Sequence, residues 1–144
     1  MKLLVNIDVE DLEAAIAFYR DGLGLSLGRR LFAGTVAELL GASSTIHLLA
    51  KQAGSTAVSR TALHRDYDRH WTPVHLDFEV DDVCAAATRA VGMGATMEGD
   101  IQTFAWGRVA TLSDPFGHGF CLLQLVGAGY DAVSDSSGVL PGSY

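Results

Sequence analysis

The octapeptide VEDLEAAI, at residues 9–16, decides the fold, because a closely similar octapeptide, VDDVCAAA, occurs at residues 80–87. A tetrapeptide that starts with glycine follows each copy, GLGL at residues 22–25 and GMGA at residues 92–95. Internal similarity with matched spacing is the sequence signature of a repeated structural unit. The chain is therefore predicted to contain two copies of one unit.

A strand and then a helix are expected at the start of each unit. Apolar residues alternate with polar ones over residues 3–9 and 74–80, which is typical of a strand with one buried face. Asp11 and Asp82 are good helix N-caps, because a carboxylate accepts hydrogen bonds from the free amides of the first turn and suits the helix dipole. The helices that follow carry apolar stripes at helical spacing, made of Leu12, Ala15, Ile16 and Tyr19 and of Val83, Ala86, Ala87 and Ala90.

Each helix is expected to end at a glycine, Gly22 or Gly92, and to be followed by three antiparallel strands. These strands are predicted at residues 25–32, 35–40 and 45–50 in the first unit and at residues 96–103, 106–113 and 119–125 in the second.

Four segments follow from this pattern. They are a first βαβββ module at residues 1–50, a linker at 51–73, a second βαβββ module at 74–126 and a C-terminal extension at 127–144. One helix covers only one face of a four-stranded sheet, so the other module must close the second face. The predicted fold is α+β, with two βαβββ modules forming a curved mixed sheet around a cavity.

The composition excludes several classes of protein. The 144 residues suffice to bury a core, and 49% of them are hydrophobic. A net charge of −7 argues against nucleic acid as a partner, and no apolar run reaches the length of a membrane span. The N-terminus lacks the pattern of a signal peptide, and the two cysteines have no metal-finger spacing. A cytoplasmic protein is expected.

Three segments resemble the vicinal oxygen chelate superfamily, which includes glyoxalases, bleomycin-resistance proteins and extradiol dioxygenases. They are VEDLEAAIAFYRDGLGL (9–25), HLDFEVDD (75–82) and WGRVATLSDPFGHGFCLLQL (106–125). The resemblance extends over residues 3–125. It implies paired βαβββ modules, a pocket for a small-molecule ligand, a homodimer and, in the enzymes, a divalent metal held by the first and last strands of the modules.

The resemblance implies four metal-ligand positions, Leu4, His47, His75 and Cys121. The internal repeat pairs the same positions, because Leu4 aligns with His75, and His47 in TIHLLA aligns with Cys121 in GFCLLQ. Leu4 supplies no donor atom. The candidate ligands are therefore His47, His75 and Cys121, two imidazoles and a thiol that suit zinc better than magnesium or manganese.

Each candidate ligand also has an interpretation without metal. Cys121 can be a small buried hydrophobic residue, as most unpaired intracellular cysteines are. His47 can line the cavity as a polar group. His75 shares a strand face with Asp77 and Glu79 and can pair with a neighbouring carboxylate.

Three residues are candidate contacts for a bound substrate. Asn6 lies on the strand face of Leu4, and Trp106 precedes the penultimate strand, where an aromatic ring can stack on a flat ligand. The resemblance places Thr111 where the dioxygenases have a polar group behind the metal ligands.

These residues allow two functions, one of a binding protein and one of an enzyme, and the sequence does not decide between them. The favoured one is a glyoxalase- or bleomycin-resistance-like protein that binds a small molecule between its modules without the usual metal site. The alternative is a divalent-metal-dependent lyase or dioxygenase with an altered His, His, Cys ligand set. The sequence allows the modules to pair within one chain or between two chains.

Overall fold

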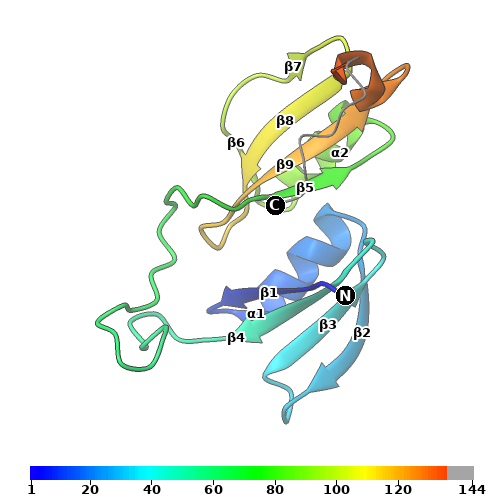
Figure 1. Cartoon of the computed structure of the whole chain (residues 1–144). Helices are drawn as coiled ribbons and strands as arrows, with labels where there is room; N and C mark the ends of the chain where they lie inside the picture. The colour runs from blue at the N-terminus through cyan, green and yellow to red at the C-terminus, as the bar shows by residue number, and fades with distance from the viewer. Residues whose placement is uncertain (136–144) are drawn as a thin grey trace.

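The computed structural model describes residues 1–135 and contains two mixed β-sheets, each with its own helix (Figure 1). The first module consists of β1 (Leu4–Val9), α1 (Leu12–Ala17), η1 (Phe18–Gly22), β2 (Ser26–Leu31), β3 (Val36–Leu40) and β4 (Thr45–Ala50). The second consists of β5 (Leu76–Glu79), α2 (Val83–Gly92), β6 (Thr96–Met97), β7 (Gln102–Thr103), β8 (Gly107–Ser113) and β9 (Gly119–Leu125), and is followed by η2 (Gly129–Val133). This arrangement confirms the predicted α+β fold.

The two sheets have the same topology, as expected of a duplicated unit. The strand orders are β1-β4-β3-β2 and β5-β9-β8-β6. The first strand of each module runs parallel to the last, and the remaining pairs are antiparallel. The single strand predicted at residues 96–103 is instead split into β6 and β7, which pair with different parts of β8. Gly99 lies between them at a φ of 153°, a backbone conformation that favours glycine and turns the chain there.

The repeated octapeptide forms the start of each helix, and both predicted N-caps are confirmed. The Asp11 carboxylate accepts a hydrogen bond from the amide of Ala14 at 3.0 Å. The Asp82 carboxylate accepts from the amides of Cys84 and Ala85 at 2.9 and 3.0 Å. These bonds satisfy amides that the first helical turn leaves free, so a local sequence signal fixes where each helix begins.

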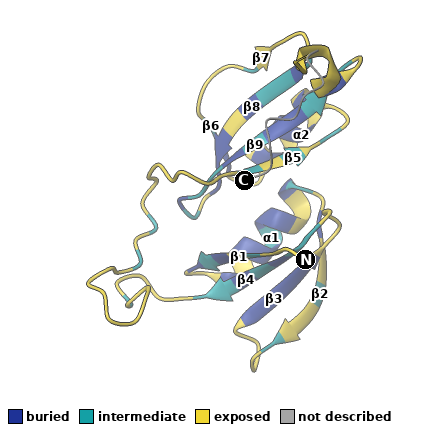
Figure 2. Cartoon of the chain, in the orientation of Figure 1, coloured by how far each residue is buried: buried dark blue, intermediate teal, exposed yellow. Residues whose placement is uncertain are grey.

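The two modules pack against each other within the chain, and the predicted helical stripes form the core between them. The buried ring of Phe18 lies among aromatic rings of both modules. The buried Tyr19 hydroxyl donates to Asp114 of the second module at 2.8 Å. The Arg89 side chain donates to the Gly22 carbonyl at 3.0 Å. Figure 2 shows the buried residues along the helices and the central strands of both sheets.

The segment between β4 and β5 runs outside both sheets (Figure 1) and is bound to each module by an ion pair. Arg65 pairs with Asp8 of β1 at 2.7 Å, and Arg69 pairs with Glu98 of the second module at 2.6 Å. These two ion pairs therefore tie the polar linker to both modules. Within residues 1–135 there is no helix of the length and apolarity needed to cross a bilayer.

Candidate functional site

A cleft lies between β1 and β5, which face each other as unpaired sheet edges. Its volume is about 250 Å³, and its walls are mostly apolar. We call it the intermodule cleft. The residues that line it include Val5, Asn6 and Tyr19 from the first module and Leu76, Phe78 and Phe120 from the second. Thr72 of the linker and Val74, two residues before β5, also line it.

A second hollow, of about 340 Å³, lies over the second sheet. We call it the second-module hollow. It is lined by Thr111 and Cys121 of the sheet, by the Arg69–Glu98 ion pair and by Trp71 of the linker. His75 lines both this hollow and the intermodule cleft, so the two spaces share a wall.

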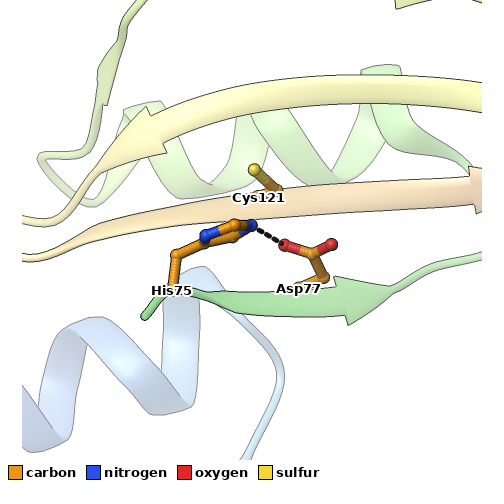
Figure 3. Close-up of side chains that lie close together, drawn as sticks. All are labelled: His75, Asp77 and Cys121. Carbon is orange, nitrogen blue, oxygen red and sulfur yellow. Dashed lines mark ion pairs between the residues drawn. The ribbon is translucent and has the colours of Figure 1, made fainter. Parts of the chain in front are cut away.

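Three side chains of different chemistry lie together beside these hollows, His75, Asp77 and Cys121 (Figure 3). Asp77 and Cys121 are register partners on the parallel strands β5 and β9, and His75 immediately precedes β5. Their nitrogen, oxygen and sulfur atoms all lie within 4.8 Å of one another. The His75 Nε2 and Asp77 Oδ1 atoms are 3.3 Å apart, so His75 does pair with a neighbouring carboxylate, as one interpretation of the sequence expected.

Burial raises the pKa of the Cys121 thiol, and the nearby Asp77 carboxylate raises it further. Hydrogen bonding with the Thr111 hydroxyl, 3.9 Å from the sulfur, lowers the pKa of the thiol and partly offsets this rise. The net rise keeps the thiol protonated at neutral pH when nothing is bound to it. A protonated thiol is a poor nucleophile, so these surroundings do not favour covalent catalysis by Cys121.

His47 lies on the first sheet and faces a different partner. Its Nε2 atom is 3.8 Å from the carboxylate of Glu38, which is buried and accepts two hydrogen bonds from Arg29, at 3.0 and 2.6 Å. Of the three predicted metal ligands, the structure brings His75 and Cys121 together and places His47 apart from them. The four-position centre implied by the resemblance does not fit these residues, because Leu4 has no donor atom.

The three predicted substrate contacts lie in three places. Asn6 lines the intermodule cleft, and Thr111 lines the second-module hollow. Trp106, which precedes the first residue of β8, stacks on Phe104 with ring centroids 5.2 Å apart and contacts the tilted ring of Tyr130 at 5.0 Å. Its role as a substrate contact stays a prediction.

Sequence reasoning did not single out the ion pair of Arg69 and Glu98 as part of a site. These residues belong to the linker and to the segment after β6, and 29 positions separate them. The sequence did indicate that Asp77 lies near His75, because alternation along a strand places residues 75 and 77 on the same face.

The Arg29–Glu38 pair predicts a specific dependence of stability on pH. Hydrogen bonding by Arg29 lowers the pKa of Glu38 to about 2. A carboxylate whose pKa is lowered by folding stabilises the protein above its unfolded pKa, and this stabilisation is lost as the pH falls towards the folded pKa. Arg29→Met is therefore expected to lower the free energy of unfolding at pH 7, and its difference from the wild type should shrink between about pH 5 and pH 2. Urea unfolding at a series of pH values measures this difference.

Arg60→Met, in the linker, removes the same charge without touching Glu38 and serves as the control. A difference between Arg29→Met and the wild type that is the same at pH 3 as at pH 7 contradicts the assignment.

The comparisons with known proteins agree with the duplicated fold. A family model described as a glyoxalase-like domain matches residues 4–123. The chain is 29% identical over 133 residues, 92% of its length, to the anthracycline biosynthesis protein DauV of Streptomyces sp. strain C5. It spans 44% of the length of that relative.

Two solved structures share the fold at low sequence identity. A glyoxalase/bleomycin resistance protein/dioxygenase family enzyme from Burkholderia phytofirmans PsJN superimposes with a TM-score of 0.67 at 20% identity, over 85% of this chain and 97% of that one. A lactoylglutathione lyase from Agrobacterium tumefaciens gives 0.59 at 22% identity, over 86% of this chain and 92% of that one. With a family model matched over most of its length, the chain belongs to the glyoxalase-like domain family of the vicinal oxygen chelate superfamily.

Proposed function

We propose that this protein binds a small organic molecule in the intermodule cleft, without the four-position metal centre of the superfamily's enzymes. The observation that carries the proposal is the cleft itself, a hollow with mostly apolar walls and a few polar groups, located between the modules. Small-molecule sites are commonly built in this way and lie at the boundaries between structural units. The volume of about 250 Å³ favours a ligand smaller than a typical drug.

The polar groups of the cleft divide into those already engaged and those assigned to the ligand. The Tyr19 hydroxyl donates to Asp114, and the His118 Nε2 atom lies 2.9 Å from the Asp8 carbonyl. The His75 Nε2 atom is 3.3 Å from Asp77. We assign the ligand's polar contact to Asn6, on the edge strand β1.

The aromatic part of the wall favours a flat ligand. The rings of Tyr19, Phe78 and Phe120 line the cleft, and aromatic side chains prefer offset or edge-on contacts with a planar partner. The relative from Streptomyces is described as an anthracycline biosynthesis protein, and anthracyclines contain flat fused rings. We therefore propose planar aromatic compounds as the class to test first. The homodimer and the cytoplasmic location expected from the sequence stay predictions.

Blocking the cleft tests the proposal. Val74 lines the cleft and is 75% exposed, so Val74→Trp adds a ring at the cleft wall with little effect on the core. The probes are anthraquinone-2-sulfonate and the fluorophore 8-anilinonaphthalene-1-sulfonate. We expect saturable binding to the wild type and a dissociation constant at least about tenfold higher in Val74→Trp, which corresponds to about 1.4 kcal/mol.

Val58→Trp is the matched control, because Val58 is an exposed linker valine outside the residues that line the cleft. It should bind both probes like the wild type. Equal binding by all three proteins, or a wild type that shows no saturable binding, rejects the cleft as the site.

A further inference from the structure

We propose that His75, Asp77 and Cys121 bind a divalent transition-metal cation, with zinc as the best match, at the edge of the second-module hollow that His75 and Cys121 line (Figure 3). All three ligands come from the second module. This distinguishes the site from the four-position centre implied by the superfamily, which draws ligands from both modules. The proposal does not depend on ligand binding in the cleft.

The spacing of the donor atoms fits tetrahedral coordination. Zinc binds imidazole nitrogen and carboxylate oxygen at about 2.0–2.1 Å, so two such ligands at a tetrahedral angle lie about 3.3 Å apart. The His75 Nε2 and Asp77 Oδ1 atoms are 3.3 Å apart. A direct charge-assisted hydrogen bond would be shorter, at about 2.7–2.9 Å. The Cys121 sulfur belongs to the same cluster, in which all three donor atoms lie within 4.8 Å of one another.

The backbone holds these donors in place on paired strands. Cys121 on β9 has a register partner on each side, Asp77 on β5 and Thr111 on β8. Sheet pairing on both sides of Cys121 fixes the position of the thiol. The Thr111 hydroxyl, 3.9 Å from the sulfur, is placed to support a bound thiolate from outside the coordination sphere.

The donor set selects the kind of metal. Sulfur and nitrogen ligands favour zinc and similar transition metals, whereas magnesium and calcium prefer oxygen ligands alone. Three protein ligands leave a fourth tetrahedral position for water or for an anionic group. The nearby Arg69 guanidinium is paired with Glu98 at 2.6 Å, so its charge is balanced and opposes a bound cation only weakly.

Cobalt and zinc titrations test the site, in a Cys84→Ser background so that Cys121 is the one remaining thiol. We expect one Co²⁺ per chain, with a thiolate-to-cobalt charge-transfer band that Zn²⁺ removes by competition. Cys121→Ser should abolish the band. Asp77→Asn, which keeps the shape of the side chain, should weaken Zn²⁺ binding at least about 100-fold, because losing even an outer-shell partner of a metal ligand costs about 10–100-fold.

His47→Ala is the matched control. A second-module site predicts unchanged Zn²⁺ affinity in this variant, whereas a His47, His75, Cys121 site predicts a loss as large as that in Cys121→Ser. Circular dichroism of every variant confirms that it is folded. The proposal is overturned if the starting protein binds no Co²⁺ through sulfur, if Asp77→Asn binds Zn²⁺ normally, or if His47→Ala loses the metal.

Discussion

Phe18→Ala is expected to lower the free energy of unfolding by about 3–5 kcal/mol, the usual cost of truncating a buried phenylalanine. Phe18 is 1% exposed. Its ring makes edge-on contacts with Tyr19, Phe116 and Phe120, at centroid distances of 5.3, 6.1 and 6.3 Å. Two of these partners belong to the second module. The substitution therefore removes apolar contacts and leaves a cavity where the modules meet.

Urea unfolding at equilibrium measures this loss, with Phe32→Ala as the matched control. Phe32 is 78% exposed between β2 and β3, so its removal should change the free energy of unfolding by no more than about 0.5 kcal/mol. If Phe18→Ala is no more destabilising than Phe32→Ala, then the two modules are not held together by the core described above.

Gly117→Ala is expected to destabilise the protein by at least about 2 kcal/mol, because two penalties add. Gly117 has a φ of 92°, in the left-handed region that costs other residues about 1–2 kcal/mol. A Cβ atom there would also collide with the backbone carbonyl of Tyr67 and lie 3.2 Å from the Asp68 oxygen. The linker would have to move away from the turn between β8 and β9.

That movement gives the Gly117 prediction a second readout. Gly117 itself lines the intermodule cleft, as do Thr72 of the linker and Val74 directly after it. A displaced linker should therefore weaken binding of the cleft probes as well as lower the free energy of unfolding.

The matched control for Gly117→Ala is Gly92→Ala. Gly92 is the last residue of α2, and no atom lies within 4 Å of the position that its Cβ would take. Alanine is the better helix former by up to about 1 kcal/mol, so this variant should be as stable as the wild type or more stable. Equal stability of the two alanine variants would show that the linker does not pack on Gly117 in solution.

The fold was largely predictable because its signals are local and occur twice. Asp11 and Asp82 begin the helices through hydrogen bonds to amides two or three residues away. The apolar stripes select the buried helical faces by spacing alone. The strand at 96–103 was the exception, because Gly99 interrupts it and β8 takes β6 and β7 as separate partners.

The candidate site was predictable only in part. The repeat identified His75 and Cys121, which lie on neighbouring strands of one sheet, and the structure brings them together. The same repeat grouped His47 with them, yet His47 belongs to the other sheet and faces Glu38. Equivalent positions in two modules converge only if the sheets are oriented to bring them together, and that orientation depends on packing between modules.

The sequence by itself therefore determined the two βαβββ modules, their caps and their buried faces, because hydrogen bonds to neighbouring amides and side-chain periodicity act over a few residues. Only the tertiary structure decided that β1 and β5 meet as unpaired edges around a cleft and that Asp77 joins His75 and Cys121. It also brought Arg69 of the linker onto Glu98. The cleft depends on how the aromatic core around Phe18 sets one module against the other. The Asp77 cluster depends on the pairing of β5 with β9, and the Arg69 ion pair on the path of the linker. All three are properties of packing between residues far apart in the chain.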